Sequence, residues 1–124
     1  MNQILYIAAG GATGAVLRYL VSTGVHQWLG RGFPYGTLVV NVSGSLIMGF
    51  LYILLIERTD AGVAWRAGLI IGLLGAFTTF STFSIETLNL IESGEQMKAT
   101  LNILFSVSLC LLGCWAGMVL GRLL

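Results

Sequence analysis

The chain has 124 residues, of which 56% are hydrophobic and only 9% are charged. Soluble proteins carry about a quarter charged residues, so this composition excludes an ordinary soluble globular protein. Six Lys and Arg against five Asp and Glu give a net charge of +1, and the sequence has no basic cluster that could neutralise the phosphates of a nucleic acid.

Four apolar runs follow one another along the chain, and each is about as long as the roughly 20 residues that a membrane-crossing helix needs. Glycine, proline and charged residues separate them. Alternation of apolar and polar residues, which β-strands would require, is absent. We predict an all-α membrane protein with a single domain of four transmembrane helices, over residues 4–23, 36–56, 66–91 and 97–123.

Many of the 17 glycines repeat at every fourth residue, as in the pairs Gly10 with Gly14 and Gly113 with Gly117. Lipid provides no hydrophobic force between helices, so close approach of backbones through small residues must replace it. This spacing predicts tight helix packing.

The positive charges do not choose an orientation in the membrane. Four spans place Arg58, Arg66 and Arg122 on one side and Arg31 and Lys98 on the other, where Arg18 joins them if its side chain extends to the nearer membrane surface. The excess of Lys and Arg sets the direction of insertion. A balance of three against three predicts that copies insert both ways up, which permits an antiparallel homodimer; the alternative is that a small bias fixes one orientation.

The third run contains the most informative segment, residues 75–84, in which five hydroxyl residues and three phenyl rings follow a glycine-rich stretch. Non-helical backbone at this depth is tolerated only inside protein or beside water, where its polar groups can hold ions. We predict a break between Gly75 and Ser81. The positive edges of the rings can accept a small anion, and the alternative is ordinary aromatic packing.

Further polar residues lie within the apolar runs. Asn41 follows Thr37 by one turn in the second run, and its amide either pins two helices together or donates to a passing ion. Asn102 and Ser106 form a similar pair in the fourth run. Arg18 either raises the local anion concentration in a vestibule or extends to the headgroups.

Two cysteines, Cys110 and Cys114, are four residues apart in the fourth run. We interpret them as small apolar fillers, since free cysteine is usually buried. The sequence carries no nucleophile, base and orienting residue in a recognisable pattern, so no enzyme activity is expected.

Three runs together resemble the CrcB/Fluc family of fluoride channels: residues 10–19 (GGATGAVLRY), 36–44 (GTLVVNVSG) and 75–86 (GAFTTFSTFSIE). The likeness extends over essentially the whole chain. It implies a multi-pass channel of the bacterial inner membrane that exports fluoride passively and reduces its toxicity. It also implies a homodimer of oppositely oriented subunits, with two pores and a sodium ion at the dimer interface.

The resemblance also implies roles for individual residues. Phe80 and Phe83 would line the pores with their ring edges toward fluoride, and Asn41 would donate to the ion. The backbone carbonyls of Gly75 and Thr78 would coordinate sodium. The remaining polar lining of the pore would comprise Ser81, Thr82, Thr37, Ser106 and Asn102, the last of which stands where many members of the family have Tyr.

A proton-coupled small multidrug transporter, also built from four helices, is the main alternative. Such a transporter needs a carboxylate within the membrane, but the first run has Arg18 and no acidic residue. Glu86 is the one candidate that the sequence offers.

Overall fold

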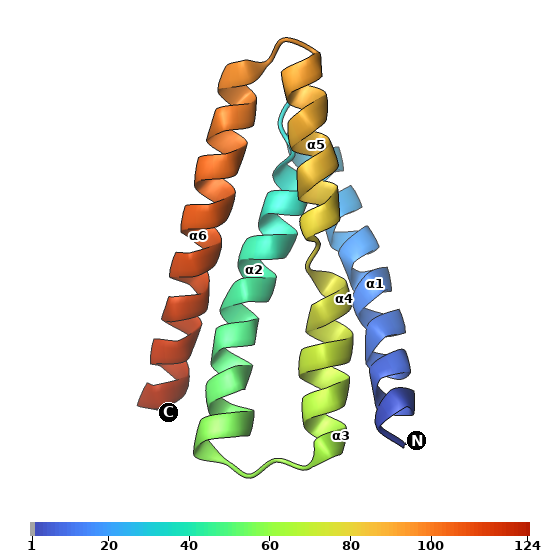
Figure 1. Cartoon of the computed structure of the whole chain (residues 1–124), viewed down its shortest axis with the longest axis vertical. Helices are drawn as coiled ribbons and strands as arrows, with labels where there is room; N and C mark the ends of the chain where they lie inside the picture. The colour runs from blue at the N-terminus through green and yellow to red at the C-terminus, as the bar shows by residue number, and fades with distance from the viewer. Residues whose placement is uncertain (1) are drawn as a thin grey trace.

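Four helical spans lie alongside one another in the computed structural model, which describes residues 2–124 (Figure 1). The start of the first span, the end of the last and the loop between the second and third lie at the same end of the molecule. Each span is long and apolar enough to cross a membrane, so the prediction of an all-helical, multi-pass membrane protein is confirmed. The helical segments are α1 (Asn2–Leu29), α2 (Tyr35–Tyr52), η1 (Ile53–Arg58), α3 (Val63–Trp65), η2 (Arg66–Leu74), α4 (Gly75–Phe77), α5 (Phe80–Glu92) and α6 (Gln96–Leu123).

The first helix is longer than the sequence predicts. Instead of ending near Thr23, α1 continues through Gly24 to Leu29, because membrane helices tolerate glycine. It ends before Gly30, whose φ of 86° is a conformation that other residues rarely adopt. The second and third spans each include a stretch of wider π-helix, η1 and η2.

Glycines bring two pairs of helices into backbone contact. A Cβ atom built on Gly10 or Gly14 of α1 would overlap a carbonyl oxygen of η2. Gly49 of α2 and Gly117 of α6 meet each other's helix backbone in the same way. The tight helix packing predicted from glycines at every fourth residue is therefore confirmed at these positions.

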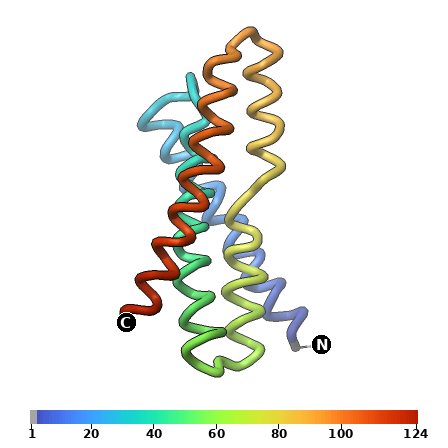
Figure 2. The backbone as a smooth tube through the Cα atoms, turned by 60° about the vertical axis from the view of Figure 1, so that its left-hand side comes forward, coloured from blue at the N-terminus to red at the C-terminus, as the bar shows by residue number. Residues whose placement is uncertain are grey.

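The third span is broken near its middle, where Figure 2 shows the backbone tube drawn out between two helical halves. α4 ends at Phe77, Thr78 and Thr79 are extended with ψ angles of 156° and 112°, and α5 begins at Phe80. The break lies inside the interval predicted from the sequence. It divides the span into η2 with α4 on one side and α5 on the other.

Candidate functional site

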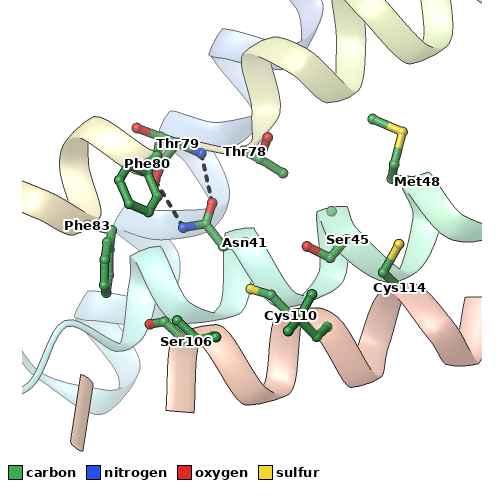
Figure 3. A pocket seen from close by; sticks show the side chains of 13 residues that line it. Asn41, Ser45, Met48, Thr78, Thr79, Phe80, Phe83, Ser106, Cys110 and Cys114 are labelled. Carbon is green, nitrogen blue, oxygen red and sulfur yellow. Dashed lines mark hydrogen bonds between the residues drawn. The ribbon is translucent and has the colours of Figure 1, made fainter. Parts of the chain in front are cut away.

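A groove of about 380 Å³ opens beside the break in the third span (Figure 3). Its walls come from α2, the break, α5 and α6. The lining residues are Asn41, Gly44, Ser45, Met48, Thr78, Thr79, Phe80, Phe83, Ser106, Val107, Cys110, Leu111 and Cys114.

The side chain of Asn41 pairs with the backbone of the break. Its Nδ2 donates to the carbonyl of Thr79 at 3.0 Å, and its Oδ1 accepts from the Thr79 N–H at 2.7 Å (Figure 3). Gly44, one turn along α2, has no side chain, and a Cβ there would overlap the side chain of Thr78. Since an unpaired backbone group at this depth costs several kcal/mol, Asn41 stabilises the broken backbone and still has a second N–H to offer.

The break also removes the usual partners of two carbonyl groups. In a continuous helix the carbonyl of Gly75 would accept from Thr79 N–H and that of Thr78 from Thr82 N–H. Here Thr79 N–H donates to Asn41, and Thr82 N–H donates to Thr79 Oγ1 at 3.2 Å. The carbonyl oxygens of Gly75 and Thr78 are thus released from the helix ladder.

Arg18 lies at the break rather than at a membrane surface. Its Nε donates to the carbonyl of Ala76 at 3.0 Å, and the residue is partly buried. Arg18 is not among the residues that line the groove. This bond favours a position at the break over extension to the headgroups, because the end of α4 provides a near acceptor of suitable polarity. The role of Arg18 toward an anion stays a prediction.

Thr79 acts as the N-cap of α5. Its Oγ1 accepts from Thr82 N–H, contacts Thr82 Oγ1 at 3.0 Å and lies 3.3 Å from Ser81 Oγ. A capping hydroxyl fixes the direction in which a helix starts. The Ser81 and Thr82 hydroxyls belong to this cap and do not line the groove of the single chain.

The rings of Phe80 and Phe83 contact each other on α5. Their centroids are 5.3 Å apart and their planes are tilted by 44°, a separation typical of interacting aromatic pairs. Phe83 is 9% exposed, whereas Phe80 is 76% exposed. One ring is held inside the bundle, and the other is open to whatever occupies or covers the groove.

A chain of side-chain hydrogen bonds leads from the groove into the contact between α5 and α6. Ser106 donates to Asn102 Oδ1 at 3.4 Å, Asn102 Nδ2 donates to Thr87 Oγ1 at 2.9 Å, and Thr87 donates to the carbonyl of Phe83 at 2.7 Å. Asn102 is only 2% exposed. This series of hydrogen bonds therefore links the groove-facing side of α6 to α5, the helix that carries both rings.

The structure brings some of the predicted site residues together and not others. Those in the groove are Asn41, Thr78, Phe80, Phe83 and Ser106. The predicted residues outside its lining are Arg18, Thr37, Gly75, Ser81, Thr82 and Asn102. The roles of both groups toward an ion stay predictions.

Several lining residues were not predicted. Ser45 and Met48 follow Asn41 along α2, and Cys110 and Cys114 follow Ser106 along α6 at intervals of four. This helical spacing is the signal that could have identified them. The two cysteines lie in the wall of the groove, are half-buried and are free thiols, and their interpretation as small apolar fillers stays a prediction.

Four membrane-crossing helices, one of them broken beside a polar and aromatic groove, define a multi-pass membrane protein of the kind that passes ions. Residues 5–118 match the family model described as CrcB-like protein, Camphor Resistance (CrcB), and the chain belongs to this family. It is similar to proteins named fluoride-specific ion channel FluC. It is 54% identical to the one from Magnetococcus marinus over 98% of this chain and 99% of that protein, and 56% identical to the one from Shewanella amazonensis over 94% of each.

A third relative, from Methylococcus capsulatus, carries the same name and is 55% identical over 98% of this chain, which covers 54% of that protein. The chain thus spans about half the length of this relative and nearly the full length of the other two. The family is one of ion channels, not of enzymes. The multidrug-transporter alternative has no support from these relatives.

Proposed function

We propose that this chain forms a fluoride-selective channel in a bacterial inner membrane, through which fluoride leaves the cell passively and its toxicity is reduced. The observation that carries the proposal is the groove at the break, where Asn41, Phe80, Phe83 and Ser106 converge. Near full-length relatives named as fluoride-specific channels support the identity of the ion. Helical spans, rather than strands, are consistent with an inner membrane.

Fluoride is small and strongly hydrated, so a narrow path must replace several hydrogen bonds at once. The edges of Phe80 and Phe83 supply positive partial charge. The second N–H of Asn41 supplies a donor. The Ser106 hydroxyl supplies another, since its 3.4 Å bond to Asn102 is long for an O–H···O bond and is readily exchanged for an anion.

Release of the ion requires that no single site holds it too strongly. The residues that line the groove include no Lys or Arg. Arg18, the nearest cation to the break, has its Nε engaged by the carbonyl of Ala76. Multiple weak contacts therefore replace one strong cationic site, and a larger halide such as chloride would lose the close fit.

Two oppositely oriented copies form the proposed channel, with two pores. Three observations support this assembly: Phe80 is 76% exposed at mid-span, the groove of a single chain is open, and the positive charges near the two membrane surfaces are nearly balanced. Without Arg18 the balance is three against two, still a small bias. Lipid would cover the remaining apolar surface, where Trp28 in the last turn of α1 and Trp65 at the end of α3 are exposed.

A structural sodium ion at the dimer interface fits the oxygen atoms present. The carbonyls of Gly75 and Thr78 lack their helical donors, and unwound backbone carbonyls are typical sodium ligands in membrane proteins. Gly75 is exposed, and a Cβ there would have only the Ile70 carbonyl nearby, at 3.8 Å. A bound cation would offset the negative ends of the two α4 segments and keep the breaks in register.

Purified protein in liposomes tests the function. Vesicles loaded with fluoride should empty rapidly when the protein is present, and vesicles loaded with chloride should stay full; equal release of the two ions would contradict the proposal. Phe80→Ile and Phe83→Ile should each abolish fluoride release. Phe105→Ile, at an exposed position on α6 outside the groove, is the matched control and should leave release unchanged.

A further inference from the structure

One end of the groove is lined by sulfur. Cys110 and Cys114 come from α6, and Met48 comes from the facing helix α2 (Figure 3). Both cysteines are free thiols. The proposed fluoride path uses Phe80, Phe83, Asn41 and Ser106 and leaves these three sulfur atoms without a role.

The spacing of the two cysteines suits a shared ligand. Residues four apart on a helix have Cβ atoms about 5–6 Å apart and lie on one face. In Figure 3 the Cys110 and Cys114 Sγ atoms point in different directions, so one side chain must change its χ1 rotamer before both sulfur atoms reach one ion. Two metal–sulfur bonds of about 2.3 Å each, the length found with zinc, then span the gap between them, and the ion is bound from adjacent turns of α6.

The surroundings select the class of metal. Thiolate and thioether ligands bind soft ions, whereas magnesium and calcium prefer oxygen. The groove lining contains no His, Asp or Glu, and three sulfur atoms fall short of the four ligands of a structural zinc site. A soft ion of low coordination number is the metal that fits.

The charge of the metal–thiolate complex narrows the choice of metal further. Binding of a divalent soft ion follows Hg²⁺ + 2 RSH → Hg(SR)₂ + 2 H⁺, in which no atom is oxidised or reduced. The product is neutral, which favours it in a low-dielectric environment where a net charge is costly. A monovalent ion such as Cu⁺ would leave a negative bis-thiolate complex.

We infer that Cys110 and Cys114, with Met48 beside them, form a binding site for a soft divalent cation, and that its occupancy closes the anion path. That the bound cation closes the path depends on the proposed function, which places Ser106 on the fluoride path. Ser106 lies one helical turn, about 6 Å, from Cys110 in the same groove. The cation enters the open groove as a neutral mercury(II) species. Its binding does not depend on fluoride conduction.

Mercury(II) chloride added to the purified full chain tests the binding. We expect one mercury per chain, loss of both free thiols and an ultraviolet thiolate-to-mercury absorption band. Because the chain has only two cysteines, Cys110→Ser and Cys114→Ser each leave one thiol and should bind about a hundredfold more weakly, the gain that a second linked ligand provides. The double variant is cysteine-free and should show no band.

Fluoride release from liposomes tests the closure. Mercury(II) should block the wild type, dithiothreitol should restore release, and the double variant should be unaffected. Single variants that bind as tightly as the wild type, or one mercury bridging two chains on a denaturing gel, would overturn the site. Stoichiometric binding with unchanged release would overturn closure alone, whereas a wild type that binds mercury but never conducts would refute the proposed function and leave the site standing.

Discussion

The two halves of the third span are attached to the bundle in different ways. η2 lies directly against the backbone of α1, where Gly10 and Gly14 leave no room for a Cβ atom and a Cβ on Gly72 would come within 2.7 Å of the Ile7 carbonyl. α5 contains no glycine. It is attached through side-chain hydrogen bonds at Thr79 and Thr87.

The two halves therefore have different roles: η2 with α1 forms a rigid support, and α5 with α6 forms a wall of the groove. Backbone-to-backbone packing has no adjustable side chain, so η2 and α1 fix the position of the break. Side-chain hydrogen bonds can exchange partners, so α5 and α6 present polar groups to an ion without being rebuilt. Substitutions in the first region should therefore act on stability, and substitutions in the second should act on conduction with smaller effects on stability.

A large effect confined to stability is expected for Gly14→Ala. Its methyl group would overlap the carbonyl oxygen of Leu73, and overpacking of this kind costs about 1–3 kcal/mol, occasionally more. Thermal unfolding in detergent measures the change. Gly24→Ala, on the same helix with nothing within 4 Å, is the control, and an equal loss in both variants would contradict backbone packing as the cause.

Asn41→Ala should impair both stability and conduction. It leaves the N–H and carbonyl of Thr79 without their partner, and each buried unsatisfied group costs about 1–3 kcal/mol. Fluoride release from liposomes should fall to background. Ser43→Ala removes a hydroxyl that bonds only within its own helix and should retain release; a conducting Asn41→Ala channel would remove this amide from the mechanism.

Thr79→Ala should destabilise the start of α5 by about 1 kcal/mol, the usual contribution of an N-cap hydroxyl. Thr79→Ser keeps the oxygen that accepts from Thr82 N–H and should behave like the wild type. Denaturant unfolding followed by circular dichroism compares the two. If serine fails to restore the stability, the Thr79 methyl group and not its hydroxyl is what matters.

The smallest effect is expected for Thr87→Val, which keeps the shape and removes the acceptor for Asn102. Hydrogen bonds between membrane helices average about 0.6 kcal/mol. Thr100→Val, at an exposed hydroxyl bonded to its own helix, is the matched control. A slower fluoride release in Thr87→Val alone would show that this bond positions Ser106, and identical rates in the two variants would limit it to packing.

The sequence was sufficient for the number and order of the helical spans and for the interval of the break, but not for the end of α1. Apolar length determines where a chain crosses lipid, and hydroxyl residues after glycines in the third run indicated where its helix ends. Asn41, Phe80, Phe83 and Ser106 could be predicted as site residues because polar and aromatic groups stand out in an apolar run. Cys110 and Cys114 do not stand out in this way, since their position in the groove depends on how α6 is rotated against α2.

Only the tertiary structure decided the partners of the polar groups. Asn41 with Thr79, Arg18 with Ala76 and Asn102 with Thr87 are separated by 38, 58 and 15 residues, and periodicity within one helix carries no information on such pairs. Composition and local pattern determined that the chain enters the membrane as helices, because the bilayer requires every backbone group to be satisfied locally. Where the third helix breaks this rule, the replacements come from other helices, and only their packing determines which ones.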